Sequence, residues 1–457
     1  MTQTYTPVAP ATSGTWRSLR RVLLAGWAVF TLGALGFVAV LGTNAPYADE
    51  WEFVPALLGH EPAVPWLWKQ HNEHRMPLPR AVVFAYFRLT HDFRAGMLLQ
   101  VAMLSALALG LMRLADALRG RPHWADAFFP VSLLHIGHWE NLVMGYQVCF
   151  VLFCALATGL TVVALRTTKA NAARSGVLAG VLLLLLALTG GSGLAVVPPV
   201  AAWLVYLAVG VWRGGAKGRA LLLLALAALP LAYLGVYFQG YQRPPGHPAP
   251  STDPLAVARV SGEVLAVSFG MGLSAVWFVV APALVAVGCA TLVLLLRRWT
   301  EPESRPAIVG LLAVAAGVTG VALAVGVGRG AWGGGMGLWS RYSMLTWPLL
   351  ATTYLVWVKL GRKWVPVALC VTAALAFPGN TGVGMMSGAS VKSEYNAIEA
   401  DHAAGLSPEQ ILRAEELRYE RAPEHAKPAI VLQGVEGRTV HAIPLLRAAN
   451  VGIFARK

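Results

Sequence analysis

The sequence predicts an all-α polytopic membrane protein with about eleven transmembrane helices and a small helical or α/β C-terminal tail. Of its 457 residues, 56% are hydrophobic and only 13% are charged, and its mean hydropathy is +0.59. Soluble domains usually carry about 25% charged residues. The apolar residues form long runs, which are typical of bilayer-spanning helices. Basic residues gather in every second loop between these runs.

Half of the 36 Lys and Arg residues lie in six groups that alternate loops place on one side of the membrane. The groups are Arg17, Arg20, Arg21; Arg113, Arg119, Arg121; Arg166, Lys169, Arg174; Arg213, Lys217, Arg219; Arg297, Arg298, Arg305; and Lys359, Arg362, Lys363. The positive-inside rule makes this side cytoplasmic. We therefore expect a cytoplasmic N-terminus and an outer C-terminus. The net charge of +14 then reflects topology and does not indicate nucleic-acid binding.

The eleven predicted spans follow the apolar runs, most of which are long enough to cross about 30 Å of hydrocarbon. They are 20–42, 95–113, 124–138, 141–165, 175–190, 193–212, 219–240, 273–296, 307–327, 343–360 and 363–377. The first is too long for a typical signal peptide, so we expect a retained anchor. We interpret Pro254 to Gly272 as a helix on the outer surface, followed by one span. A second crossing in this region would reverse the orientation of everything after it.

Three domains follow from these spans. They are a cytoplasmic segment 1–19, a transmembrane domain 20–377 with a large outer loop 43–94, and a soluble tail 378–457 outside the membrane. In the tail, Ser407-Pro408-Glu409-Gln410 predicts a helix start, with Ser as N-cap and Pro at the first helical position. This helix should extend to about Arg421, and a strand is predicted at Ala429–Leu432. The four cysteines lie in apolar runs without a CxxC motif, which indicates neither a disulfide nor a zinc site.

Two adjacent carboxylates, Asp49 and Glu50, follow the first span. Acidic residues contribute little to membrane orientation, so topology does not explain them. Two roles stay open: a general base on an acceptor hydroxyl, or a ligand for a divalent cation that neutralises a phosphate. An ordinary solvated turn is the structural alternative. Trp51 and Phe53 flank the pair, which favours a loop folded back on the membrane.

The polar run His71-Asn72-Glu73-His74-Arg75 lies in the same outer loop. On a helix, His71 and His74 would share a face and form half a metal site, but Pro77 and Pro79 indicate that a helix begins only after the run. Arg75 and Arg80 offer forked donors for an anion, so we expect this loop to contact phosphate or sugar. A plain loop is the alternative.

Glu140 and Gln147 lie near the outer end of two predicted spans, beside His135, His138 and Asn141. Ionisable and strongly polar side chains at membrane depth are candidates for function because their burial is costly. Glu140 is equally well explained as a helix-end cap in contact with water. Gln147 needs a polar partner inside the bundle, so Gly145-Tyr146-Gln147 should face protein rather than lipid.

Arg329 and Arg341 lie on the outer side, against the positive-inside pattern, within the glycine-rich segment 326–342. This segment is neither a dinucleotide-binding motif nor a P-loop. Its glycines let a ligand approach the backbone, and Tyr342 follows Arg341 directly. An outer-leaflet phosphate would account for both arginines, and phospholipid headgroups are the alternative ligand.

At these residues the chain resembles the C-type glycosyltransferase superfamily, polytopic enzymes that use polyprenyl-phosphate-linked sugars. The resemblance covers about residues 17–377 and is carried by the long first outer loop and by Asp49-Glu50 soon after the first span. The chain is also similar to little-characterised bacterial multi-span proteins with Asp-Glu-Trp, His-Asn-Glu-His-Arg, Trp-Glu-Asn and Ser-Arg-Tyr segments. The resemblance implies a bacterial plasma-membrane location and an acidic base or metal ligand at Asp49.

The leading hypothesis is therefore a membrane glycosyltransferase that moves a sugar from a polyprenyl phosphate to an envelope glycan, lipid or protein at the outer face. Asp49 would be the base, with Glu50 assisting it or binding a divalent cation, and no other cofactor is indicated. Substrate contacts are expected from His71, Glu73, His74, Arg75, Arg80, Glu140, Gln147, Arg329, Arg341 and Tyr342. Membrane lipids are expected partners. A transporter or flippase of an envelope precursor, and a structural membrane protein with a docking tail, are the alternatives.

Overall fold

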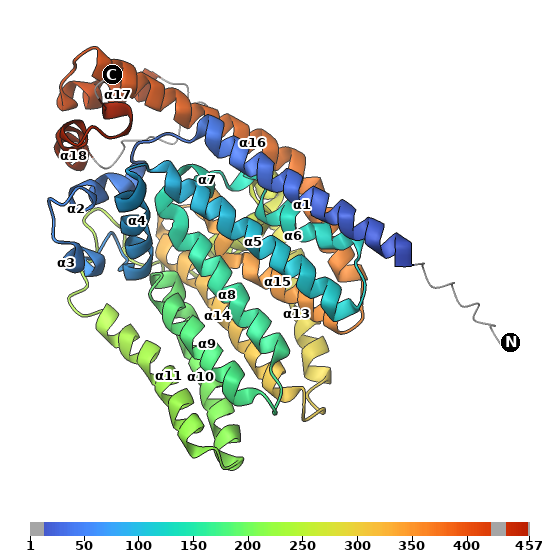
Figure 1. Cartoon of the computed structure of the whole chain (residues 1–457). Coiled ribbons are helices and arrows are strands. Elements are labelled where there is room, and N and C mark those ends of the chain that lie inside the picture. The colour runs from blue at the N-terminus through green and yellow to red at the C-terminus, as the bar shows by residue number, and fades with distance from the viewer. Residues whose placement is uncertain (1–12, 422–435, 456–457) are drawn as a thin grey trace.

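The computed structural model describes residues 13–421 and 436–455, and their secondary structure is helical (Figure 1). Eight helices are long and apolar enough to cross a membrane. They are α1 (Ser13–Leu41), α5 (Arg94–Arg119), α8 (Val148–Arg166), α10 (Gly191–Arg213), α11 (Lys217–Tyr237), α13 (Trp277–Arg297), α14 (Arg305–Arg329) and α16 (Trp364–Ala403). Two further apolar helices, α9 (Ala172–Ala187) and α15 (Ser343–Lys359), have only 16 and 17 residues. The protein is thus a helical multi-span membrane protein, and the count of about eleven spans is not confirmed.

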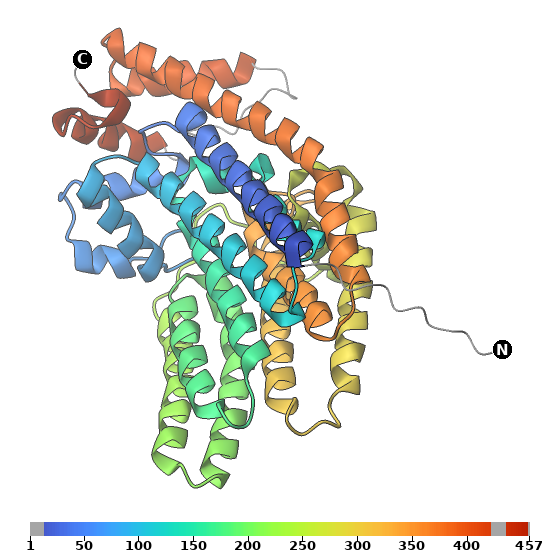
Figure 2. The ribbon, with the colours of Figure 1, turned by 45° about the vertical axis from the view of Figure 1, so that its right-hand side comes forward.

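The six basic groups gather at one end of the bundle, which we call the basic end. It lies away from the short helices α2 (Val54–Leu57) and α3 (Ala63–Trp68) in Figures 1 and 2. Ion pairs join its segments: Arg20 of α1 lies 2.7 Å from Asp116 of α5, and Lys169 lies 3.0 Å from Glu303. The opposite end, which we call the site end, carries the polar loops.

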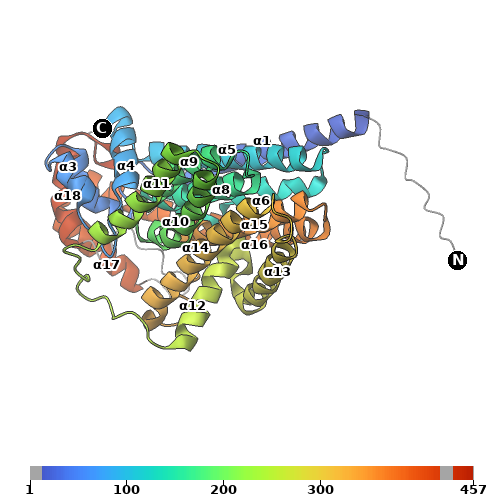
Figure 3. The ribbon, with the colours of Figure 1, turned by 90° about the horizontal axis from the view of Figure 1, so that it is seen from below.

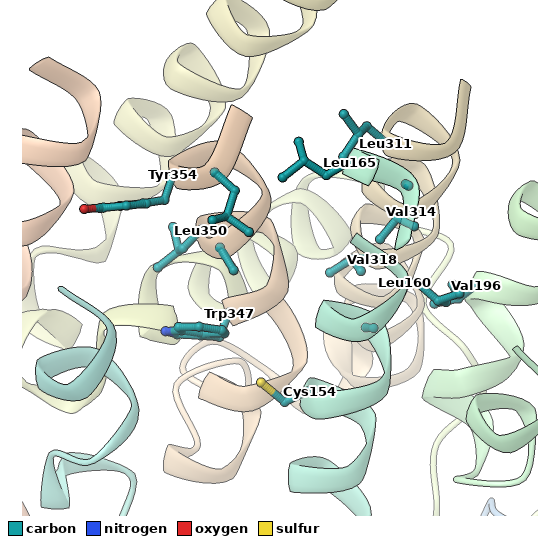
Figure 4. Close-up of a cluster of buried hydrophobic side chains, with 14 of the residues drawn as sticks. Cys154, Leu160, Leu165, Val196, Leu311, Val314, Val318, Trp347, Leu350 and Tyr354 are labelled. Atoms are coloured by element: carbon teal, nitrogen blue, oxygen red, sulfur yellow. The ribbon is translucent and has the colours of Figure 1, made fainter. Parts of the chain in front are cut away.

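The core of the bundle is built where α8, α10, α14 and α15 meet (Figure 4). Leu160, Val314 and Trp347 are fully buried there. Glycine lets the helices approach closely: a Cβ on Gly310 of α14 would lie 2.6 Å from the ring of Trp203. Small residues at such crossings are usual in membranes, where van der Waals contact drives helix association.

The predicted span 124–138 is wrong as a single helix. It consists of η2 (Trp124–Ala127), α6 (Phe128–Leu133) and η3 (Ile136–His138), followed by α7 (Glu140–Val143) and η4 (Gly145–Gln147). The segment nevertheless connects the two ends of the bundle. Asp126 accepts hydrogen bonds from Arg119 at 3.0 Å and from the Tyr354 hydroxyl at 2.7 Å near the basic end, and Glu140 contacts Arg341 at the site end.

Residues 254–297 contain α12 (Pro254–Ala266), the turns η5 (Val267–Phe269) and η6 (Met271–Val276), and then α13, with one candidate span at Met271–Arg297. Asn380 of α16 holds the turn: it accepts from Gly272 N at 2.7 Å and donates to Phe269 O at 2.8 Å. Glu263 and Val264 of α12 are fully buried. One face of the helix is therefore packed against the bundle, while Leu255 on the other face is 79% exposed, and its predicted place on the outer surface stays a prediction.

Helix α16 continues 26 residues past the predicted end of the last span at residue 377, so the tail is not separated from the bundle there. The predicted helix start is confirmed: α17 (Pro408–Arg421) begins with a reciprocal cap between Ser407 and Gln410. The predicted strand Ala429–Leu432 lies outside the described residues. Helix α18 (Glu436–Ala448) and η10 (Gly452–Phe454) pack against the loop after α1, where Phe454 meets Trp51 edge-on (Figures 1 and 3).

Candidate functional site

A cavity of about 520 Å³ opens at the site end of the bundle. Its lining comes from the loop after α1, the turn 71–74, the starts of α8 and α10, the ends of α11 and α14, and the segment before α15. Asp49 and Arg341, which are 292 residues apart in the chain, both line it. We call this space the cavity.

Asp49 is the accessible carboxylate of the cavity, with a side chain that is 39% exposed. It is presented by η1 (Ala48–Phe53), after Ala48 has turned the chain with a positive φ of 45°. The buried imidazole of His71 lies between two carboxylates: its Nδ1 is 2.6 Å from Glu52 and its Nε2 is 3.5 Å from Asp49. Asn72 donates to Asp49 at 3.4 Å. Asp49, His71 and Glu52 thus form a carboxylate–imidazole–carboxylate chain.

Within the group Asp49, His71 and Glu52, the positive and negative charges stabilise one another. Burial alone would raise the pKa of Asp49, but the hydrogen bond and charge of His71 outweigh it and lower that pKa to about 2. Burial alone would lower the pKa of His71, but Asp49 and Glu52 raise it to about 9. At neutral pH, Asp49 is therefore an ionised carboxylate beside an imidazolium. Glu52 was not singled out from the sequence, although its spacing of three from Asp49 was a usable signal.

Glu50 does not line the cavity. Its carboxylate is buried and accepts from the backbone N–H of Tyr47 at 2.9 Å and of Tyr146 at 2.7 Å. Burial raises the pKa of Glu50 to about 8, against these two hydrogen bonds. The predicted direct catalytic role of Glu50 therefore has no geometric support. Its contacts tie η1 to η4 and so hold Asp49 in place.

The segment His71–His74 is a two-residue turn and not a helix. His71 and His74 exchange backbone hydrogen bonds of 2.7 and 2.8 Å, and Asn72 takes a positive φ of 46°. As the prolines predicted, helix α4 begins only at Pro77. The turn aims Glu73 at Arg329, whose guanidinium lies 2.8 Å from that carboxylate, and His247 lies 2.6 Å from the same carboxylate.

Arg341 is the second cavity arginine, and Glu140 fixes its position. The guanidinium donates to Glu140 at 2.6 Å, the Arg341 N–H donates to the same carboxylate at 3.1 Å, and Ser340 donates at 2.7 Å. Trp339 packs against the guanidinium, with its ring centre 4.2 Å away. Glu140 is buried and does not line the cavity, so its predicted substrate contact is replaced by a contact with Arg341.

Arg75 and Arg80 do not join the two cavity arginines. Arg75 donates to Gln239 O at 2.7 Å and is not in the cavity lining. Arg80 is fully buried between the rings of Phe53 and Trp66 and donates to the carbonyls of Trp66 and Lys69. The predicted contact of these two side chains with an anion is therefore not supported, and Arg329 and Arg341 are the arginines that line the cavity.

His74, Gln147 and Tyr342 do line the cavity. Gln147 is buried and faces protein, as predicted, and its Nε2 contacts the sulfur of Met144 at 3.2 Å. Its Oε1 has no hydrogen-bond partner, and the same is true of His74 Nδ1. Unpaired buried polar atoms are uncommon, which makes this part of the wall a candidate ligand contact.

Sequence reasoning did not single out the start of α10 as part of the site. Thr189, Gly190, Gly191 and Ser192 all line the cavity. Gly190 has φ +125°, a conformation that L side chains rarely adopt. A Cβ on Gly191 would lie 2.9 Å from His74 Nδ1, which is too close for a side chain. The backbone at this position therefore lies beside the cavity without a side chain.

One part of the cavity wall is apolar. It is formed by Leu194 of α10, Leu234 of α11, and Val321 and Val325 of α14. Among the described residues, no group of three His, Cys, Asp or Glu side chains converges in a way that could hold a metal ion.

A scan against protein-family models and a search of curated proteins both found no match to this chain.

Proposed function

We propose that the protein is a membrane glycosyltransferase that moves a sugar from a polyprenyl-phosphate donor to an envelope acceptor. The reaction would take place at the outer face of a bacterial plasma membrane. The observation that carries this proposal is the make-up of the cavity, which joins an ionised carboxylate and two arginines to an apolar wall inside the bundle. A lipid with an anionic head group likewise combines a charged end with an apolar chain, so it would match both parts of the cavity.

The apolar wall supports a lipid-linked donor. Helices α11 and α14 both pack against α10, and all three contribute apolar side chains to the cavity. Leu234, Val321 and Val325 belong to helices that are candidate membrane spans. A prenyl chain that leaves the bilayer beside these helices would keep its hydrocarbon in apolar surroundings while its head reaches Arg329 and Arg341.

Asp49 is suited to the acceptor side of the reaction. The acceptor oxygen would attack the anomeric carbon, the bond from that carbon to the phosphate oxygen would break, and its electron pair would stay on the phosphate. The acceptor proton would pass to Asp49, which becomes a sufficient base only as the new bond makes that hydroxyl acidic. Arg329 and Arg341 would stabilise the charge that develops on the phosphate.

The described residues do not favour a metal held by the protein alone, because Asp49 has His71 beside it but no third His, Cys, Asp or Glu side chain placed to complete a site. We therefore assign no step to a divalent cation.

The cavity is confined to one end of the bundle. Its lining on α10 ends at Ala195, and its lining on α14 begins at Val321 and extends to Arg329. Both stretches occupy only the site-end portions of their helices. A cavity open at one end is shared by enzymes and by alternating-access transporters, so a transfer assay is needed to distinguish the two.

The direct test is transfer by the purified protein in phospholipid vesicles, with radiolabelled polyprenyl-phosphate sugars as donors and a bacterial envelope fraction as acceptor. The proposal predicts label in the acceptor that requires both the protein and the prenyl chain. Movement of the intact donor across the vesicle membrane, with no label in the acceptor, would instead establish the flippase.

A further inference from the structure

The short helix η1 has three faces, because a 3₁₀-helix contains three residues per turn and residues i and i+3 point the same way. Asp49 and Glu52 share one face, and both carboxylates contact His71. Glu50 points to a second face, where it accepts the N–H of Tyr146 at 2.7 Å. The turn 71–74 and the bundle therefore hold two faces of η1, and a different part of the chain holds the third.

The third face of η1 carries Trp51, and the C-terminal segment covers it. The ring of Phe454 meets that of Trp51 edge-on, with the ring centres 6.0 Å apart, and neither side chain is more than 1% exposed. Helix α18 packs against η1 and α2 beside this contact (Figure 1). Its Ile443 and Leu446 are fully buried in the same hydrophobic cluster as Trp51. The last elements of the chain thus enclose the side chain two positions after Asp49.

The same part of the chain holds the backbone that leads into η1. The N–H of Ile453 donates to Asn44 O at 3.3 Å, and the Tyr395 hydroxyl of α16 donates to Pro46 O at 2.7 Å. Gly452 has φ +61° and approaches this loop so closely that a Cβ there would overlap the Asn44 oxygen. A side chain at Gly452 would therefore push the C-terminal segment away from the loop.

We propose that Phe454 and Gly452 are positioning residues for Asp49, so that the C-terminal segment 449–455 is a component of the site and not a separate docking module. Because η1 has only six residues, a movement of Trp51 turns the whole element and shifts the Asp49 carboxylate relative to the two cavity arginines. The inference takes the role of Asp49 from the proposed function. The packing of η1 does not depend on that role.

The first test follows η1 directly and needs no sugar transfer. Ala48→Cys places a thiol in the cavity lining at the start of η1, and its modification by an impermeant maleimide is timed in the purified full-length protein that also carries Cys289→Ser. We expect Phe454→Ala to raise the rate of modification roughly tenfold or more, because loss of a buried Phe weakens the closed arrangement of η1. Phe153→Ala, which removes an equally buried Phe from α8, is the matched control and should leave this rate unchanged.

A pair of glycines tests the same contact without removing hydrophobic surface. Gly452→Ala meets Asn44, whereas Gly405→Ala after α16 has a similar positive φ of +80° but meets nothing within 4 Å. Both changes strain the backbone in the same way, so only Gly452→Ala should raise the rate of modification at Ala48→Cys. Unchanged rates in both Phe454→Ala and Gly452→Ala would overturn the inference. Equal increases in the two control variants would overturn it as well, because the effect would then be a general loss of stability.

The kinetic test separates this inference from the proposed function. We expect Phe454→Ala to lower kcat for sugar transfer roughly 10- to 100-fold, with an unchanged KM for the donor because other contacts hold Arg329 and Arg341. Phe454→Leu, which restores apolar volume, should recover most of the rate. Faster modification of Ala48→Cys in Phe454→Ala, with no transfer by the wild-type protein, would leave the positioning of η1 standing and remove the glycosyltransferase. A wild-type kcat in Phe454→Ala would show instead that this contact does not position Asp49, while the glycosyltransferase stands.

Discussion

The guanidinium of Arg341 lies 2.6 Å from the carboxylate of Glu140, although 201 residues separate them in the chain. Glu140 also accepts the Arg341 N–H and the Ser340 hydroxyl, so one buried carboxylate holds three donors of the Ser340-Arg341 segment. Glu73 plays the corresponding part for Arg329. The polar residues of two distant loops therefore act in pairs, with one acid positioning each cavity arginine.

Removal of this partner should destabilise the fold. Glu140→Gln keeps the size of the side chain but leaves the Arg341 charge without its counter-ion in a site where Glu140 is only 4% exposed. Loss of one member of a buried pair costs about 3–5 kcal/mol, and the partial exposure of Arg341 reduces this to about 2 kcal/mol. The midpoint of unfolding in detergent measures the change. Glu303→Gln, which removes an exposed ion pair with Lys169, is the control. Equal midpoints for the two variants would contradict the positioning role.

Glu50 should make stability depend on pH. Its pKa in the folded protein is about 8, well above the ordinary value of 4.5, so the folded state keeps a proton that the unfolded chain has lost. Stability should therefore fall as pH rises from about 4.5 to about 8. Glu50→Gln removes the titration but keeps only one oxygen acceptor, whereas the Tyr47 and Tyr146 amides donate to different oxygens of Glu50. We expect this variant to lose some stability at every pH and to show a flatter profile across this range. A profile that keeps the wild-type slope would show that Glu50 is not the group responsible.

The orientation of the bundle is open to direct labelling. We expect a membrane-impermeant thiol reagent applied to intact cells to modify Ser393→Cys near the site end and to spare Thr300→Cys at the basic end. Both positions are exposed. The background protein should carry Cys289→Ser, because Cys289 is exposed whereas the other three cysteines are buried. Labelling of Thr300→Cys with protection of Ser393→Cys would place the cavity in the cytoplasm.

The sequence contained most of the information on the long helices, because apolar length and basic flanking residues are local signals. It did not predict the break of 124–138 into short pieces. The pieces end at Ala127, Leu133 and His138, and the His135 side chain caps the last of them, yet the overall run stays apolar. It also did not predict that α16 continues to Ala403, because the polar residues after 377 resemble those of a soluble tail.

The site was predicted in part. The cavity lining includes Asp49, His71, Glu73, His74, Gln147, Arg329, Arg341 and Tyr342, all of which were candidates from the sequence. The sequence could not assign partners, because the pairs Glu73–Arg329 and Glu140–Arg341 depend on the folded arrangement of distant loops. Nor could it separate Asp49 from Glu50. The two are neighbours in the chain, but the short helix η1 turns one toward the cavity and buries the other.

The rate of sugar transfer by Asp49→Asn tests the role of Asp49 as the base most directly. This change keeps the size and the hydrogen-bonding capacity of the side chain but removes the proton acceptor, so we expect a loss of about 10²–10⁴-fold in kcat. Binding of the polyprenyl-phosphate donor should be retained. Asp92→Asn, in the same loop and paired with Arg94 at 2.6 Å, is the matched control and should transfer at the wild-type rate. Near-normal transfer by a folded Asp49→Asn protein would contradict the assignment of Asp49 as the base.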